Sequence, residues 1–135
     1  MSEEARKRQW EDKSTGGLSS MSILLLWLAT PGNWQRWLSS NDRMGLMSEI
    51  LERMHARQIF YHDESDIHRM INQQHARYCM ACEIYYDSPR QDPAAGLGVA
   101  EVAVLRRCRH WYVLNVIIGP MRVLPNKDSN EDSPV

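Results

Sequence analysis

Hydrophobic residues cluster in segments with a helical period, separated by short polar turns. The densest segment is the unbroken apolar run at residues 23–28, which ends in Trp27-Leu28 and is followed by Thr-Pro-Gly-Asn at 30–33. Adjacent Pro and Gly are strong turn signals. A short apolar run does not by its period separate helix from strand, but its leucine and methionine content favours a helix over residues 21–30. Ser19 or Ser20 is available as its cap.

Two longer amphipathic helices follow. The first is predicted over residues 43–57, because Met47, Ile50, Leu51 and Met54 form one apolar stripe at the spacing i, i+3, i+4 and i+7. The second is predicted over residues 65–86, after the capping cluster at 63–66. Its predicted buried side consists of Ile67, Met70, Ile71, Gln74, Tyr78, Cys82 and Tyr85. Its predicted outer side consists of Arg69, Asn72, Gln73 and Ala76, flanked by His68 and His75 on one edge and Arg77 on the other.

The C-terminal part contains a third apolar region. Residues 87–98 carry two prolines and two glycines and are predicted to form a loop. A helix over 99–107 and a second helical segment to residue 118 follow, and Gly119-Pro120 ends them. The polar stretches at 1–20 and 120–135 are predicted to be a disordered arm and a disordered acidic tail. The pattern therefore predicts an all-α chain.

Size and charge indicate one domain of ordinary composition. The chain has 135 residues, 43% hydrophobic and 24% charged, with a formal net charge of −1. Three cysteines are too few for a disulfide scaffold and favour a reducing, intracellular setting. The apolar run at 21–29 is too short to cross a bilayer, and the acidic residues before it disfavour a secretory signal. No membrane partner is expected.

Four short motifs, in order, resemble the Myb/SANT-like domains of fungi and oomycetes, which are related in plan to plant trihelix domains. They cover about residues 22–120. They are the run from Trp27 to Trp37 (WLATPGNWQRW), the segment 47–54 (MSEILERM), the segment 66–71 (DIHRMI), and the segment 104–114 (VLRRCRHWYVL) with Ile118-Gly119 after it. The third tryptophan of ordinary Myb repeats is replaced here by Met70 or Ile71.

The resemblance implies a three-helix, helix-turn-helix bundle over residues 21–86, with a C-terminal helical extension over 99–119. It also implies a nuclear, double-stranded-DNA-binding protein, a transcriptional regulator or a transposon-derived DNA binder, that reads the major groove with its third helix. The implied base-facing residues are His68, Arg69, Asn72, Gln73, Ala76 and Arg77. The candidates for phosphate contacts are Arg36, Arg43, Arg106, Arg107 and Arg109.

Two other interpretations remain open for that helix face. Residues 34–90 hold seven arginines against eight acidic residues, which favours a SANT-type protein-interaction module without DNA binding. The absence of acidic residues between Ile67 and Cys82 favours DNA. A polar, solvated face is also what any surface helix presents.

No cofactor, metal or catalytic site is predicted, and the protein is not expected to be an enzyme. His75, Cys79 and Cys82, with His68 before them, share one flank of a helix, and a single helix closes a tetrahedral metal site poorly. No local signature of a nucleophilic or phosphate-binding site occurs. The C-terminal helix, with Trp111, Tyr112, Ile117 and Ile118, would suit either closure of the core or self-association.

Overall fold

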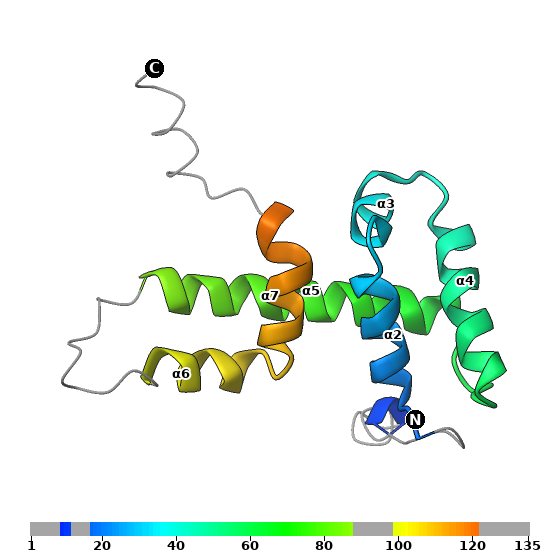
Figure 1. The fold of residues 1–135 in the computed structure, drawn as a ribbon, viewed down its shortest axis with the longest axis horizontal. Helices are drawn as coiled ribbons and strands as arrows, with labels where there is room; N and C mark the ends of the chain where they lie inside the picture. The colour runs from blue at the N-terminus through cyan, green and yellow to red at the C-terminus, as the bar shows by residue number, and fades with distance from the viewer. Residues whose placement is uncertain (1–8, 12–16, 88–98, 122–135) are drawn as a thin grey trace.

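The computed structural model describes residues 9–11, 17–87 and 99–121, and every regular element within these ranges is helical. The prediction of an all-α chain is therefore confirmed for the described residues. Most of the predicted arm at 1–20, loop at 87–98 and tail at 120–135 lies outside them. The elements are α2 (Ser20–Ala29), α3 (Asn33–Ser39), α4 (Arg43–Ala56), α5 (Glu64–Asp87), α6 (Val99–Arg107), α7 (Trp111–Ile118) and the 3-10 turn η2 (Gly119–Met121) (Figure 1).

Helix α5 is the longest element and the axis of the arrangement. It runs along the length of the molecule, with α4 against its first half and α6 and α7 against its second half (Figure 1). Helix α2 packs on both α4 and α7, so it joins the two groups. In the view of Figure 1, α2 and α7 cross in front of α5.

The helix starts follow the capping residues in the sequence. The Ser19 side chain accepts a hydrogen bond from the Ser22 amide at 3.1 Å, and Asp42 accepts one from Gly45 at 3.2 Å. At the start of α5, Asp63 and Asp66 each accept a hydrogen bond from the other's amide, at 2.9 and 3.2 Å. These bonds satisfy amides that have no partner within the helix.

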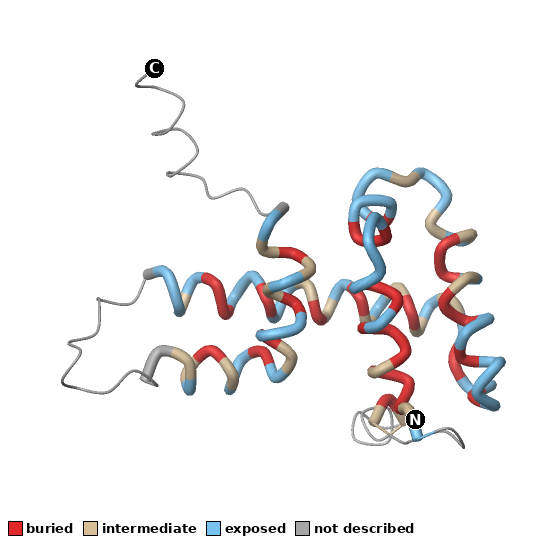
Figure 2. Tube along the Cα trace, viewed as in Figure 1, coloured by how far each residue is buried: buried red, intermediate tan, exposed pale blue. Residues whose placement is uncertain are grey.

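A single hydrophobic core runs through the helices (Figure 2). Trp27 from α2, Trp37 from α3 and Tyr78 from α5 are among its largest fully buried side chains. Buried aromatic rings of this size remove much apolar surface from water and dominate the stability of a small domain. The stretch at residues 22–39 therefore forms one wall of the core.

Helix α3 is an element that the hydrophobic pattern does not predict. The expected turn at residues 30–33 is present, with Gly32 in the left-handed region at φ 88°, but a helix begins immediately after it. The side-chain amide of Asn33 donates to the Trp27 carbonyl oxygen at 2.9 Å, and this bond connects the end of α2 to the start of α3. This helix places Trp34 and Trp37 against the core.

The described part of the predicted N-terminal arm is packed against the body. Trp10 is only 5% exposed, and Ser19 and Ser20 are also buried. Residues 9–11 are helical. Within the described residues, no helix combines the length and the apolar character that crossing a membrane requires.

Candidate functional site on the outer face of α5

The face of α5 that points away from the core carries most of the predicted base-facing residues. Arg69, Asn72, Ala76 and Arg77 are exposed, and Gln73 is partly exposed. The opposite side chains, from Ile67 to Cys82 at helical spacing, are buried. The sequence period therefore assigns Ile67, Ile71, Gln74, Tyr78 and Cys82 to the buried side correctly, but the prediction is wrong for Tyr85, which is 37% exposed near the end of α5, and Met70 is only partly buried. We call the set Arg69, Asn72, Gln73, Ala76 and Arg77 the outer face.

The two histidines at the edge of this face pack onto the tryptophans of α3. His68 lies 5.8 Å from Trp37 and His75 lies 5.0 Å from Trp34, measured between ring centres. Both histidines are half-buried. Burial lowers the pKa of His75. His68 is a predicted base contact, but one side of its ring packs against Trp37 of α3.

A groove of about 640 Å³ separates the first turns of α4 and α5. It brings Arg43, a predicted phosphate contact, to the same hollow as Arg69 and Asn72. Acidic side chains, Asp42 and Glu64, also line it. Arg69 is 3.4 Å from Asp66, so this end of the outer face carries charges of both signs. The groove walls are formed by Asn41, Asp42, Arg43, Met44, Met47, Glu64, Ser65, His68, Arg69 and Asn72.

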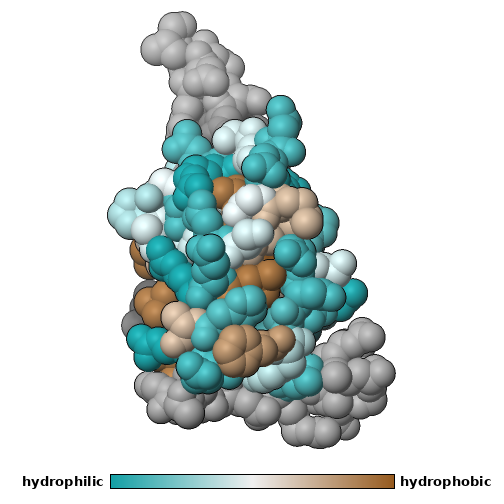
Figure 3. Space-filling view, turned by 90° about the vertical axis from the view of Figure 1, so that its right-hand side faces the viewer, coloured by the Kyte–Doolittle hydropathy of each residue, from teal (hydrophilic) through white to brown (hydrophobic). Residues whose placement is uncertain are grey.

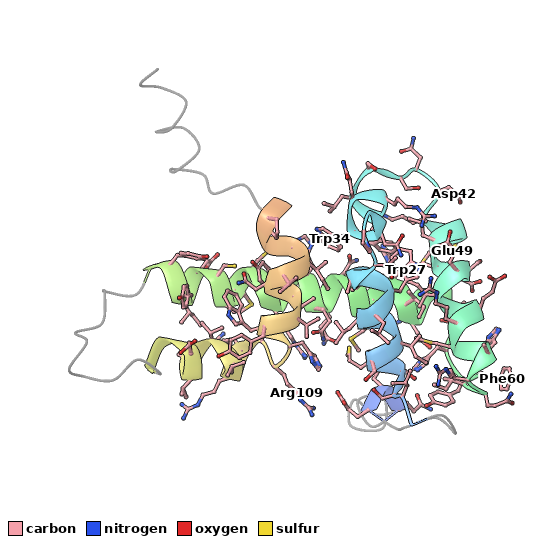
Figure 4. The ribbon with its side chains drawn as sticks, viewed as in Figure 1. Trp27, Trp34, Asp42, Glu49, Phe60 and Arg109 are labelled. Carbon is pink, nitrogen blue, oxygen red and sulfur yellow. The ribbon has the colours of Figure 1, made fainter. Side chains whose placement is uncertain are left out.

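Arg36 has a structural partner at the corner between α2, α3 and α4. Its guanidinium donates to Glu49 at 2.6 Å and to the Asn33 side chain at 2.7 Å. Trp27 Nε1 donates to the same Glu49 carboxylate at 3.2 Å (Figure 4). The hydrogen bond from Arg36 is the main reason why the pKa of Glu49 is lowered. Together these residues form a hydrogen-bonded network that joins α2, α3 and α4.

Arg43 is held in a similar way. Its Nε donates to the Trp37 carbonyl oxygen at 3.0 Å, and the guanidinium lies 4.7 Å from the centre of the Trp37 ring. A cation over an indole face is attracted by the ring's quadrupole. These two predicted phosphate contacts, Arg36 and Arg43, thus have intramolecular roles that hydrophobic and charge patterns do not reveal.

The remaining predicted phosphate contacts lie at the turn between α6 and α7. Arg106, Arg107 and Arg109 are all exposed, and Arg109 is 3.4 Å from Glu11 (Figure 4 labels Arg109). The charge of Arg77, on the outer face, acts on His110 at this turn. Burial is the main cause of the lowered pKa of His110, and the charges of Arg109 and Arg77 lower it further, while Glu11 raises it.

A second cluster, which no sequence motif indicates, joins Ser20, His62 and Asp66. Ser20 Oγ is 2.9 Å from His62 Nε2, and His62 Nδ1 is 3.6 Å from Asp66 Oδ2. The order resembles that of a hydrolase triad. Ser20, however, is fully buried and Trp10 covers the histidine ring, so a substrate has no access to the hydroxyl in this arrangement.

The histidine and cysteine side chains along one flank of α5 do not point to a common centre. Cys79 is exposed and Cys82 is buried, and neither forms a disulfide. His68 and His75 face the tryptophans of α3. Among the described residues, no group of three or more His, Cys, Asp or Glu side chains is placed to hold a metal ion.

Helix α7 has one side in the core and one side in solvent. Trp111, Leu114 and Ile118 are buried, which closes the core over the second half of α5. The ring of Trp111 stacks on Tyr78 with centres 5.0 Å apart. Tyr112 is exposed. Of the two uses that the sequence allows for this helix, core closure is therefore seen.

Comparison with known proteins adds no assignment, because no protein-family model, no curated protein and no solved structure matches the chain.

Proposed function

We propose that α2, α4 and α5 form a Myb/SANT-like helix-turn-helix unit, and that the protein is a nuclear DNA-binding protein, a transcriptional regulator or a transposon-derived DNA binder. The outer face of α5 is the surface that meets DNA. The observation that carries this proposal is the exposure of Arg69, Asn72, Gln73 and Arg77 together on one side of a helix that has no acidic residue between Ile67 and Cys82.

The chemistry of these side chains suits base edges and phosphates. Asn and Gln side chains pair with adenine through two hydrogen bonds, and Arg pairs with guanine in the same way. The charge of Arg77 acts on His110 at the α6–α7 turn, where Arg106, Arg107 and Arg109 are exposed. Phosphate contacts of this kind supply much of the affinity for DNA.

A second function, a SANT-type protein-interaction module, is favoured by a specific observation. Arg36, Arg43 and Arg109 all have intramolecular partners. The chain also has almost no net charge. A module that binds protein would use the same outer face without needing an excess of positive charge. The side of the molecule nearest α4 is mostly hydrophilic with separate hydrophobic spots (Figure 3), so a continuous apolar docking surface is not visible on that side.

The two functions are separated by measuring the affinity for a random-sequence DNA duplex against salt, for example by fluorescence anisotropy between about 50 mM and about 200 mM salt. The DNA-binding proposal expects affinity that falls steeply as salt rises. No measurable binding at the lowest salt would sink it and leave the protein-interaction module.

Selection from a pool of random duplexes then tests the role of the outer face in choosing a sequence. The variant Asn72→Ala/Gln73→Ala is expected to lose sequence preference while it retains salt-dependent binding, because side chains that read bases add specificity to a phosphate-based affinity. The control Glu52→Ala/Gln58→Ala alters two exposed polar residues near the far end of α4 and is expected to select the same sequences as the wild type. Equal loss of preference in both variants would mean that the outer face does not read the sequence.

A further inference from the structure

Residues 9–11 dock on the body mainly through one ring. Trp10 lies over His62 with ring centres 4.2 Å apart and is 5% exposed. The Tyr61 hydroxyl donates to the Gln9 carbonyl oxygen at 3.0 Å, at an exposed position. An exposed hydrogen bond adds little net stability, because water can replace either partner. The contact between Trp10 and His62 is therefore the anchor of this segment.

His62 is held in a site built for its neutral form. Its side chain is 2% exposed, Ser20 Oγ lies 2.9 Å from Nε2, and Asp66 Oδ2 lies 3.6 Å from Nδ1. With the proton on Nδ1, Nε2 accepts from the serine hydroxyl. A separation of 3.6 Å is too long for a full hydrogen bond. One distant carboxylate and the attraction between a cation and the face of Trp10 offset only part of the cost of burying an imidazolium.

Among the described residues, the carboxylates that act on His62 both come from the start of α5, and the Tyr61 ring also contacts His62 with ring centres 4.7 Å apart. Asp66 and Asp63, at the start of α5, both raise the pKa of His62, but burial is the larger effect and the pKa is lowered overall. Asp66 also pairs with Arg69. Helix α2 contributes the Ser20 hydroxyl and contains no ionisable residue. From the N-terminal segment, Trp10 covers the ring, while the carboxylate of Glu11 is directed to Arg109.

We propose that residues 9–11 form an acid-released clasp: when His62 takes up a proton, the Trp10 ring leaves it and the segment detaches. Detachment lets water reach the imidazolium, which the closed arrangement excludes. Because an unperturbed histidine titrates near pH ~6.5, the ratio of open to closed clasp rises by up to about tenfold for each pH unit below that value. The pKa of His62 is lowered in the closed state, so the open state binds a proton more tightly. A falling pH therefore favours the open state.

Release has one consequence for the arginines at the turn between α6 and α7. Glu11 pairs with Arg109, which lies at the same turn as the exposed Arg106 and Arg107. Opening of the clasp frees Arg109 for an external anion, so acid would strengthen DNA binding. This consequence rests on the proposed function, whereas the clasp itself does not.

The test is ¹⁹F NMR of the full chain labelled with 5-fluorotryptophan, followed from about pH 7.5 to about pH 5. The Trp10 signal is assigned with the variant Trp10→Phe, and its exposure is read from the solvent isotope shift between H₂O and D₂O. The wild type is expected to show Trp10 moving from a buried to an exposed signal as the pH falls below about 6.5. A buried Trp10 signal over the whole range would overturn the proposal.

Two variants separate the clasp from general acid unfolding. In His62→Gln, which cannot be protonated in this range, Trp10 is expected to keep one signal at every pH. The control His55→Gln alters an exposed histidine of α4 and is expected to behave as the wild type does. A Trp10 transition that persists unchanged in His62→Gln would refute the mechanism. If that variant does not fold, the wild type still decides: the imidazole signal of His62 and the Trp10 signal must titrate at one midpoint, and different midpoints would refute it.

Discussion

The two sides of α5 obey different physical constraints. On the inner side, Ile67, Ile71 and Tyr78 are buried to within 1% and pack against other helices. On the outer side, Arg69 and Asn72 are exposed, and the ion pair of Arg69 with Asp66 lies at the surface. Burial fixes the identity and size of a side chain, because packing leaves little room for change. At an exposed position the identity of the side chain is less constrained by packing, so the side chain can serve binding instead of stability.

This difference indicates where stability and function are separable. A substitution on the inner side changes the fold and any activity together. A substitution on the outer side should change binding alone, because exposed side chains contribute little to the free energy of unfolding. The boundary is occupied by His68 and His75, which contact the tryptophans of α3 and belong partly to each side.

The largest expected effect is on the inner side. Ile71→Ala should lower the free energy of unfolding by about 2–5 kcal/mol, because it removes buried methyl groups and leaves a cavity. Urea denaturation followed by circular dichroism measures this. Asn72→Ala, the neighbouring residue on the outer side, is the matched control and should change the free energy by no more than about 0.5 kcal/mol. Similar losses for the two variants would mean that the sides are assigned wrongly.

An intermediate effect is expected for the hydrogen bond that links the inner side to α7. The Tyr78 hydroxyl donates to the Asn115 side chain at 2.7 Å. Tyr78→Phe should therefore cost about 0.5–1.5 kcal/mol. The comparison is Tyr112→Phe, whose hydroxyl makes an exposed bond to Glu101 at 3.3 Å and should cost less. A larger loss from Tyr112→Phe in the same urea assay would contradict the account.

The smallest effect is expected at the boundary and depends on pH. Burial lowers the pKa of His75, so the unfolded chain binds a proton more readily than the folded one. Stability from the neutral histidine is present above its ordinary pKa of about 6.5 and is lost as pH falls towards the lowered value. His75→Gln should reduce the slope of stability against pH below about 6.5. An unchanged slope would show that another group is responsible.

The helices that the sequence predicts well are those with local signals. Helix α4 was expected over 43–57 and spans Arg43–Ala56, and α5 was expected over 65–86 and spans Glu64–Asp87. Each carries its own cap and an apolar stripe. Helix α3 has only seven residues and no side-chain cap, so its formation depends on Gly32, on the hydrogen bond from Asn33 to α2 and on the burial of Trp34 and Trp37. A local pattern does not encode that dependence.

The sequence predicts the part of the candidate site that lies on one helix, α5. The exposure of Arg69 and Asn72 follows from the period of α5. The pairing of Arg36 with Glu49 joins residues that lie on different helices, and Ser20 and His62 are 42 positions apart. Such contacts require the tertiary arrangement. The predicted DNA contacts, the nuclear location and the absence of catalysis stay predictions.

The central claim is that the outer face of α5 binds DNA, and one comparison of affinities tests it most directly. Arg69→Ala/Arg77→Ala and Arg53→Ala/Arg57→Ala each remove two exposed arginines, the first pair from α5 and the second from the end of α4. Both change the net charge equally. The account predicts that only the α5 variant weakens binding to a duplex and flattens its salt dependence, by a slope of about one for each arginine that contacts a phosphate. Equal weakening by the two variants, or none by either, would contradict it.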